Sequence, residues 1–381
     1  MLDAVRFLAT TRDFGFDFVT GVPCSHLTPL IDAAAGAPGG WVVATSEGEA
    51  VAIAAGAWLA GRTPMVLMQN SGLGNAVNPL TSLSWPFAVP ALLVVSRRGA
   101  PGEKDEPQHG LMGPVTLDLL DLVGVVHEPL PSDDEALAAA LGRALRVIGD
   151  ERRPFAFVVG RDGFAKNSLD GVDCPVPAPG RVIDRRGGCG RPPRMTAMAR
   201  ALTALPDDSA VIATTGHCGR ELFTLGDAPR FLFMVGAMGG ASATALGVAL
   251  CVDRPVVVFD GDGAALMKLG NLATIGARAP RRLIHVIFDN ERHVSTGGQR
   301  TVSAGVDFAA VAAACGYPVA IRCDDLPGFE AAVAEAARTD GPVLIHAKVG
   351  HEAVSGLGRP TVEPRAVADR FRAFLNMQAV R

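Results

Sequence analysis

Two apolar runs in the second half of the chain constrain the fold more than any other feature. The runs cover residues 256–259 and 283–288, and both are rich in the β-branched residues that favour strands. A helix-like segment, residues 264–279, separates them. This order of strand, helix and strand predicts two parallel strands of an α/β sheet, whose carboxyl ends lie at the same edge.

Polar residues follow both runs. In order, they are Asp260-Gly261-Asp262-Gly263, then Asp289-Asn290, then the Gly-rich turn Ser295-Thr296-Gly297-Gly298-Gln299. Asp262 and Asn290 supply hard oxygen ligands of the kind that Mg²⁺ combines with phosphate oxygens. The glycines at 261 and 263 let backbone N–H groups approach a phosphate closely. We therefore predict a magnesium–diphosphate site at this edge; taken alone, Asp262 could instead be an ordinary turn residue.

The bulk composition fits two well-buried domains. The 381 residues exceed the about 100–200 residues of a typical single domain, and 49% of them are hydrophobic while 19% are charged. A net charge of −4 gives no bulk attraction for nucleic acid or for an anionic membrane. The seven cysteines form no C-x-x-C pair, which predicts reduced thiols in a cytoplasmic protein rather than a disulfide frame or a zinc site.

Two stretches bear on cellular location. The N-terminal residues show no signal-peptide pattern. Residues 231–252 carry no charge and include glycines at 236 and 240, a spacing found in packed membrane helices. However, this stretch is rich in Gly, Ala, Ser and Thr, so its hydrophobicity is low. We therefore expect it to be part of a soluble fold that leads into the strand at Val256.

Strand and helix signals alternate along both halves of the chain. The predicted strands are 16–20, 41–45, 64–69, 91–96, 155–159, 210–214, 256–259, 283–288, 319–322 and 342–348. The predicted helices are 2–14, 27–35 with Ser25 as N-cap, 50–60, 115–124, 133–148, 195–204, 264–279, 308–315, 327–337 and 366–377. Residues 70–75 are predicted to be a polar loop, and the Pro-, Gly- and Arg-rich residues 165–194 an interdomain linker. The pattern predicts two α/β domains with parallel sheets.

Three segments together resemble the thiamine-diphosphate-dependent enzymes. Gly261-Asp262-Gly263, with Asn290 28 residues after the aspartate, is similar to the cofactor signature of that superfamily, with Asp289 in place of the first asparagine of its pair. Residues 46–50 resemble the segment that carries the superfamily's glutamate, and residues 236–239 resemble the loop that supports the bend of the cofactor. The resemblance implies a pyrimidine-binding domain at 1–164 and a diphosphate-binding domain at 195–381, with no middle domain.

Within that superfamily, the chain resembles the phosphonopyruvate decarboxylase family over nearly its whole length. The strings that carry the resemblance are Met68–Pro79, Arg98-Gly99, Lys104–His109, Thr215-Gly216, Arg220-Glu221-Leu222, His293 with Ser295–Gln299, and Leu357-Gly358-Arg359-Pro360-Thr361. The chain departs from the family at Glu291-Arg292, where smaller residues are common, and at Cys24-Ser25-His26, where the family more often begins with an acidic residue. The related sulfopyruvate decarboxylases, often split into two chains, share the architecture.

The resemblance implies thiamine diphosphate and Mg²⁺ as cofactors. Glu47 would share a proton with the cofactor's aminopyrimidine, because an apolar pocket raises the pKa of a carboxyl group; the alternative is that Glu47 only caps the helix that follows it. The metal ligands would be the side chains of Asp262 and Asn290 and the backbone carbonyl of Arg292. The other implied cofactor contacts are Thr215, Gly216, His217, Met238, Gly261 and Gly263.

An acidic 2-oxo acid needs fixed cations and N–H donors for its binding. The residues expected to bind it are Ser25, Asn70, Arg98, Lys104, Gln108, Ser295 and Thr296. The reaction also needs an acid near the reacting carbon. The options are His26, Glu106, His109 and His293, and we favour His109 and His293 because both lie within the matched strings.

The resemblance implies a reaction and an assembly. The reaction is the non-oxidative decarboxylation of phosphonopyruvate to phosphonoacetaldehyde in phosphonate antibiotic biosynthesis, with sulfopyruvate or another acidic 2-oxo acid as the alternative substrate. The assembly is at least a homodimer, because in this superfamily the cofactor lies between the pyrimidine domain of one subunit and the diphosphate domain of another. A carboligase would usually carry a middle domain and often a flavin site, and the short linker at 165–194 leaves no room for either. A silent binding protein would be expected to lack Glu47 or Asp262. A Rossmann dehydrogenase would show G-x-G-x-x-G after its first strand.

Overall fold

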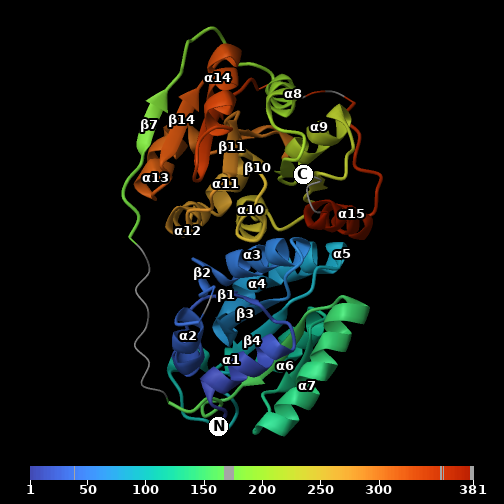
Figure 1. The fold of residues 1–381 in the computed structure, drawn as a ribbon. Helices are drawn as coiled ribbons and strands as arrows, with labels where there is room; N and C mark the ends of the chain where they lie inside the picture. Colours follow the sequence, from blue (N-terminus) through green and yellow to red (C-terminus); the bar gives the residue numbers. More distant parts are fainter. Residues whose placement is uncertain (38, 167–175, 352–353, 355, 378–381) are drawn as a thin grey trace. The chain divides into compact units, whose positions relative to one another are not determined.

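The computed structural model describes residues 1–37, 39–166, 176–351, 354 and 356–377 (Figure 1). The chain divides into two compact units, Met1–Cys174 and Pro175–Arg381. Each unit has its own sheet, and all strands within each of these two sheets are parallel. The predicted fold class is therefore confirmed. Residues 167–175 of the predicted linker lie outside the described residues, and the predicted domain boundaries stay predictions.

The first unit is built on a six-stranded sheet with the strand order β2-β1-β3-β4-β6-β5. Its strands are β1 Phe18–Gly21, β2 Val42–Val43, β3 Pro64–Gln69, β4 Leu92–Ser96, β5 Val126–Pro129 and β6 Phe155–Val159. Its helices are α1 Ala4–Asp13, α2 Thr28–Ala35, α3 Glu47–Leu59, α4 Leu73–Pro79, α5 Trp85–Phe87, α6 Met112–Leu122 and α7 Asp134–Arg146. Every residue of β4 and β6 is buried, as expected for central parallel strands that are covered on both faces.

Helix α3 begins three residues before the Ala-rich run at Ala50 that was predicted to start it. Ser46 caps it, because its Oγ accepts a hydrogen bond from the backbone N–H of Glu49 at 3.3 Å. The Glu49 carboxylate in turn accepts the N–H of Thr45, the residue before the cap, so the two side chains together fix the start of the helix. All residues of α3 are buried, which is typical of a helix that is apolar on every side.

The second unit is built on a seven-stranded sheet with the order β7-β14-β15-β11-β10-β8-β9. Its strands are β7 Arg181–Asp184, β8 Ala210–Ala213, β9 Phe231–Phe233, β10 Val256–Gly261, β11 Leu283–Asp289, β14 Val319–Cys323 and β15 Val343–Lys348, and β12 Arg292–His293 pairs with β13 Gln299–Arg300 in a small antiparallel ribbon. Its helices are α8 Arg194–Ala204, α9 His217–Leu225, α10 Ala241–Ala249, α11 Asp262–Met267, α12 Asn271–Arg278, α13 Phe308–Ala314, α14 Leu326–Ala336 and α15 Pro364–Asn376. Helix α10 packs on β10, and α15 packs on β9.

Several local predictions were wrong. Residues 70–75 are not a loop, because a 3-10 turn at Asn70–Gly72 leads into α4, which buries Leu73 and Ala76 on one face. Residues 264–279 are two helices rather than one, since the backbone leaves the helical region at Lys268. Ser25 does not cap α2; its Oγ instead accepts a hydrogen bond from Arg98 Nη1 at 3.0 Å.

Three strands of the two parallel sheets, and both strands of the small ribbon, were not expected from the sequence. Strands β5 and β9 are short, and β5 is mostly half-buried, so neither has a long apolar run. Strand β7 lies within the predicted linker and pairs with β14 at the edge of the second sheet. The uncharged residues 231–252 contain β9 and the nine-residue helix α10.

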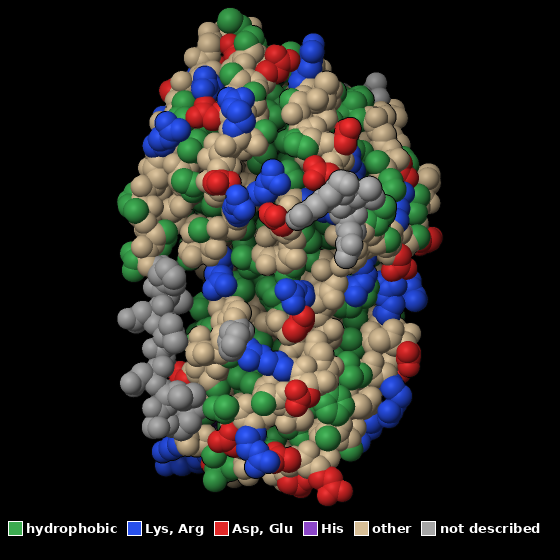
Figure 2. Space-filling model, viewed as in Figure 1, with side chains coloured by type: hydrophobic (Ala, Val, Ile, Leu, Met, Phe, Trp, Pro, Cys, Tyr) green, Lys and Arg blue, Asp and Glu red, His purple; other side chains and the backbone are tan. Residues whose placement is uncertain are grey.

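On the face drawn in Figure 2, basic and acidic side chains lie among one another, as the small net charge suggests. None of the helices in the described parts of the chain is both long and apolar enough to cross a membrane.

Candidate active site

Polar residues of the second unit gather at the carboxyl ends of four neighbouring strands, β11, β10, β8 and β9. Asp262 follows β10 directly, and Asn290 follows β11. The Thr215–His217 turn follows β8, and the loop 236–239 comes after β9. Ligands of open α/β sheets bind at this edge, so the topology brings together residues that lie far apart in the sequence.

A cavity of about 150 Å³ opens among these strand ends. Its lining includes most of the predicted cofactor and metal residues, together with one predicted proton donor and two predicted substrate residues. The first group is Thr215, His217, Met238, Gly261, Asp262, Gly263, Asn290 and Arg292, and the others are His293, Ser295 and Thr296. Gly216 instead lines a second, larger cavity that borders the first. The structure therefore brings together all of the cofactor and metal residues that were predicted in the second unit.

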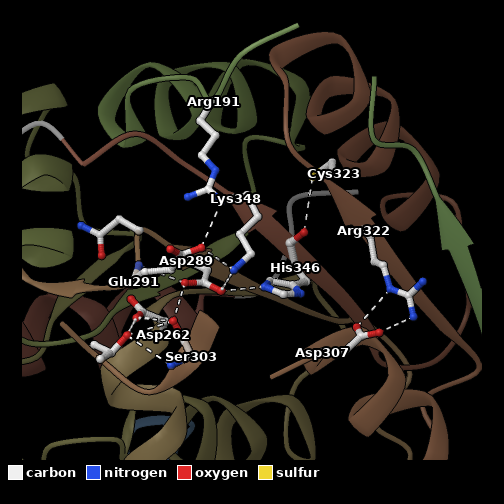
Figure 3. Close-up of polar contacts among 12 residues, drawn as sticks. Arg191, Asp262, Asp289, Glu291, Ser303, Asp307, Arg322, Cys323, His346 and Lys348 are labelled. Carbon is white, nitrogen blue, oxygen red and sulfur yellow. Dashed lines mark hydrogen bonds and ion pairs between the residues drawn. The ribbon is translucent and has the colours of Figure 1, made fainter. Parts of the chain in front are cut away.

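Asp262 is a buried carboxylate, with only 3% of its surface exposed. The Thr301 hydroxyl donates a hydrogen bond to its Oδ2. The Ser303 Oγ lies 3.0 Å from the same oxygen (Figure 3). Burial raises the pKa of Asp262, and the nearby charge of Asp289 raises it further. A bound cation would offset the cost of keeping this carboxylate ionised, so the position suits a metal ligand.

Ion pairs anchor the residues on either side of Asn290 (Figure 3). Asp289 is fully buried and accepts hydrogen bonds from His346 Nε2 at 2.9 Å and from Lys348 Nζ at 2.7 Å. Lys348 Nζ also donates to Glu291 Oε1 at 2.9 Å, and Arg191 reaches the same oxygen at 3.0 Å. Burial alone would raise the pKa of Asp289, but these donors outweigh it and hold the pKa well below its usual range.

The backbone at Glu291 is left-handed, with φ of +59°. This conformation is unfavourable for a residue with a Cβ atom, by about 1–2 kcal/mol. The ion pairs from Lys348 and Arg191 hold the Glu291 side chain while the backbone turns. The turn lets Asn290 Oδ1 accept the N–H of Arg292 at 3.2 Å, and His351 Nδ1 donates to the Asn290 carbonyl at 2.8 Å.

Ser303 links the two strand ends. Its Oγ lies 3.0 Å from Asp262 Oδ2 and 2.8 Å from Asp289 Oδ1. It is fully buried, so these contacts are shielded from water. The hydroxyl group therefore fixes the spacing between the residue after β10 and the last residue of β11.

Two left-handed residues present Met238 to the cavity. Ala237 has φ of +47° and Gly239 has φ of +79°, so the chain reverses on both sides of the methionine. A Cβ atom at Gly239 would lie 2.7 Å from the backbone oxygen of Ala264, which leaves room only for glycine. Met238 is half exposed and lines the cavity, as the predicted support for a bent cofactor requires.

The second glycine of the Gly-Asp-Gly motif has a packing role. A Cβ atom at Gly263 would lie 2.4 Å from Cε1 of His293, so the imidazole ring rests directly on the glycine. The His293 carbonyl accepts the N–H of Gly298 at 2.9 Å, which closes the turn that carries Ser295 and Thr296. His293 is thus held at the cavity wall beside the predicted metal residues.

These residues fit a diphosphate with its metal ion. The Nδ1 atom of His217 is buried and has no hydrogen-bond partner among the described residues, so it can serve a ligand in the cavity. No group of three or more His, Cys, Asp or Glu side chains in the described residues could hold a metal. A cation would therefore depend on the mixed oxygen set of Asp262, Asn290 and the Arg292 carbonyl, which suits Mg²⁺ better than a softer metal.

Glu47 lies in the first unit, as the first residue of α3 after β2. It is 9% exposed, and its Oε2 accepts a hydrogen bond from Asn75 Nδ2 at 2.8 Å. Gly72 packs against the carboxyl group, since a Cβ atom there would lie 2.2 Å from Glu47 Cδ. Glu47 does not cap the helix, because Ser46 fills that position. Asn75 and Gly72 thus fix the position of its carboxyl group.

Arg98 and Asn70 meet at the carboxyl ends of β4 and β3. Asn70 is fully buried, and its side chain bonds to the Arg98 backbone through the carbonyl at 2.9 Å and the N–H at 3.1 Å. The Arg98 guanidinium donates through two nitrogens to Asp105, whose side chain is 4% exposed, and through Nη1 to Ser25. The structure thus brings these three predicted substrate residues together, but it also pairs the Arg98 charge with a carboxylate.

The other predicted residues of the first unit differ in exposure. His109 is buried, and its Nδ1 lies 3.3 Å from the Ser71 hydroxyl. Lys104 and Gln108 are exposed. His26 is half-buried, and burial, followed by the charge of Arg98, lowers its pKa.

Sequence reasoning missed two contributors. Arg194 lines the diphosphate cavity, and its guanidinium donates through two nitrogens to Glu221, both at 2.8 Å. No local motif marks this pair, because its members lie on different helices. Asn75 lies within a matched string, and its place near Glu47 depends on the helix that was predicted to be a loop.

The comparisons with known proteins agree with this geometry. Residues 4–121 match the model of the N-terminal TPP binding domain of thiamine pyrophosphate enzymes, and residues 214–347 match the C-terminal TPP binding domain. Benzoylformate decarboxylase from Polynucleobacter necessarius has a similar fold, with a TM-score of 0.71 over 93% of this chain and 100% of that one, at 14% identity. The fold and the site thus define a thiamine pyrophosphate enzyme.

Two curated relatives narrow the class. Phosphonopyruvate decarboxylase of Streptomyces viridochromogenes is 47% identical over 379 residues, which is 98% of this chain and 95% of the relative. Sulfopyruvate decarboxylase of Methanosarcina acetivorans is 30% identical over 323 residues, 82% of each chain. The chain belongs to the phosphonopyruvate decarboxylase family of thiamine pyrophosphate enzymes, and a decarboxylase is a carboxy-lyase.

Proposed function

We propose that the protein decarboxylates 3-phosphonopyruvate to phosphonoacetaldehyde and CO₂ with thiamine diphosphate and Mg²⁺. The observation that carries this proposal is the near full-length similarity to the phosphonopyruvate decarboxylase of S. viridochromogenes. The cavity at the strand ends of the second unit supports it, because this cavity combines a buried carboxylate with a buried amide oxygen. The cytoplasm and a pathway of phosphonate biosynthesis are the setting we propose.

In this proposal, Asp262, Asn290 and the Arg292 carbonyl would hold Mg²⁺, which would balance the charge of the diphosphate. When bound, the cofactor would supply a nucleophilic carbon and the electron sink that decarboxylation requires. Glu47 holds a proton at the aminopyrimidine, and its contact with Asn75 supports this role by fixing the carboxyl orientation. Met238 supports the bend of the cofactor from the loop after β9.

The remaining predicted roles concern the substrate. Ser295 and Thr296, at the wall of the cavity, would bind it, together with Ser25, Asn70, Arg98, Lys104 and Gln108 of the first unit. His293 or His109 would donate the proton to the reacting carbon. We further propose a homo-oligomer in which the cofactor is shared between subunits, so that Glu47 and Asp262 at one site come from different copies.

Sulfopyruvate is the second candidate substrate. The similarity to the sulfopyruvate decarboxylase of M. acetivorans supports it, although the identity is lower and the aligned part shorter. Phosphonate and sulfonate groups are both tetrahedral oxyanions, but only the phosphonate carries a second ionisable proton. Turnover of the two acids by the purified enzyme with thiamine diphosphate and Mg²⁺ would separate these candidates. Faster turnover of sulfopyruvate would replace the substrate and leave the cofactor assignment in place.

The test of the mechanism is the variant Glu47→Gln. Loss of a positioned proton-transfer group typically slows a reaction about 10²–10⁴-fold. We expect such a loss in kcat, with thiamine diphosphate still bound and the circular dichroism spectrum unchanged. Glu135→Gln, an exposed glutamate of the same unit, is the matched control and should keep full activity. Near-normal decarboxylation by Glu47→Gln would overturn the role proposed for Glu47.

A further inference from the structure

A second cavity, of about 410 Å³, borders the diphosphate cavity in the second unit. The two share Thr215, His217 and Ser295 in their walls. Gly216 separates them with φ of +91°, and a Cβ atom there would come within 3.5 Å of the Ser295 hydroxyl. A molecule in the larger cavity would therefore touch the residues that also face the cofactor site.

The charge in this second cavity is entirely positive. Its described lining contains two arginines, Arg220 and Arg359, and no aspartate or glutamate. The rest is mainly apolar, with Phe233 and Val367 among the buried contributors. Burial lowers the pKa of His217; the charges of Arg194 and Arg220 lower it further, while that of Glu221 raises it. An apolar pocket with fixed cations favours an anion of moderate size.

Hydrogen bonds from Arg220 hold the segment 357–363, called the strap below, which carries Arg359. Arg220, on α9, donates through Nε to the carbonyl of Gly358 at 3.1 Å and through Nη2 to that of Leu357. Both acceptors are uncharged, so these bonds position the backbone without neutralising the guanidinium. Pro364 begins helix α15 on the other side, and α15 packs on β9. The short strap between them carries Arg359 at the cavity wall.

The ion pair of Arg98 with Asp105 points to a different arginine as the main partner of the substrate anion. Arg98 was the arginine predicted from the sequence to bind the acidic substrate, but Asp105 accepts two of its donor groups. Arg359 is exposed and has no carboxylate partner within the described residues. A free guanidinium is better suited than a paired one to bind a dianion, because no ion pair must first be broken.

We propose that the larger cavity binds the tetrahedral oxyanion of the substrate, phosphonate or sulfonate, through Arg359. Arg220 is a positioning residue that fixes the strap carrying Arg359. This inference rests on the proposed function, since it assigns one end of a 2-oxo acid whose carbonyl must reach the cofactor. Arg359 thereby becomes the residue that distinguishes acidic 2-oxo acids from uncharged ones.

The test compares Arg359→Gln with Arg365→Gln, which removes the same charge from an exposed position of α15 that does not line the cavity. A charge-assisted hydrogen bond corresponds to about 10- to 100-fold in affinity. Arg359→Gln should therefore raise KM for phosphonopyruvate about 10- to 100-fold with a much smaller change in kcat. Arg359→Lys should be intermediate, because lysine restores the charge without the planar fork. Arg365→Gln should match the wild type.

Binding measurements separate this inference from the proposed function. Phosphonoacetate and sulfoacetate lack the 2-oxo group, so their binding to the enzyme loaded with thiamine diphosphate and Mg²⁺ can be titrated without turnover. Weaker binding of these acids by Arg359→Gln than by the wild type supports the site. The acid that the wild type binds more tightly identifies the preferred oxyanion. Equal binding by the variant and the wild type overturns it, even if decarboxylation is normal. A parallel loss of thiamine diphosphate affinity also overturns it, because Arg359 would then serve the cofactor. A wild-type enzyme inactive on both acids would overturn the proposed function alone.

Discussion

Lys348 offers the sharpest test of how the metal loop is held. Its ammonium group lies 2.7 Å from Asp289, which is fully buried, and 2.9 Å from Glu291. The variant Lys348→Met keeps the length of the side chain and removes both ion pairs. It leaves a buried carboxylate without its lysine donor, and it leaves the left-handed Glu291 with Arg191 alone.

The magnitude follows from burial. Removing one partner of a buried ion pair costs about 3–5 kcal/mol. The Lys348 side chain is 18% exposed, and Asp289 keeps donors from His346 and Ser303. These two facts reduce the expected loss in the free energy of unfolding to about 2–3 kcal/mol. We also expect Mg²⁺-dependent binding of thiamine diphosphate to weaken, because Asn290 lies between the two residues that Lys348 anchors.

The assay is urea unfolding of the cofactor-free protein, followed by circular dichroism. Tryptophan fluorescence is unsuitable, because Trp41, Trp58 and Trp85 all lie in the first unit while Lys348 lies in the second. Calorimetric titration of thiamine diphosphate at several Mg²⁺ concentrations provides the second measurement. The exposed Lys166→Met is the control for loss of charge. A change below about 0.5 kcal/mol, the usual range for surface substitutions, together with unaltered Mg²⁺ dependence, would refute the reasoning.

Two further predictions follow from packing and burial. Gly72→Ala should lower kcat strongly, because its Cβ atom would lie 2.2 Å from Glu47 Cδ, whereas Gly74→Ala, with no atom within 4 Å, should leave kcat unchanged; equal rates for the two variants would argue against a precise position for Glu47. Cys218 is 3% exposed, and burial raises its pKa to about 12, so iodoacetamide should leave it unlabelled up to about pH 9 while exposed Cys189 reacts, as peptide mass spectrometry can check. Rapid native labelling of Cys218 would contradict the closed cavity wall.

Much of the fold could be predicted because its central strands are long and apolar. The runs at 64–69 and 155–159 coincide with β3 and β6, since a strand covered on both faces has a continuous hydrophobic sequence. Strands β5 and β9 lack this signal, as one is mostly half-buried and the other has three residues. The helix at residues 73–79 was missed because its Gly and Asn content favours a loop, while burial of Leu73 and Ala76 decides the structure.

The site was predictable where its residues follow strand ends and less so where they act through distant partners. The motif around Asp262 and Asn290 is local, and both side chains line one cavity. The partners of Arg98 were not evident, because a solvated arginine and one paired with Asp105 have the same sequence signal. Lys348 was likewise not assigned to the site. It lies 59 residues after Asp289 in the chain, and only the pairing of β15 with β11 brings the two side chains together.

The left-handed backbone at Glu291 couples the choice of residue at position 291 to the residues at 191 and 348. Glycine at this position would relieve the unfavourable φ of +59°, but it would also remove the carboxylate that Lys348 and Arg191 hold. Without Glu291, Arg191 would lose its ion pair, and Lys348 would retain only Asp289. The three residues should therefore change together among relatives of this chain, and a smaller residue at 291 should occur with other residues at 191.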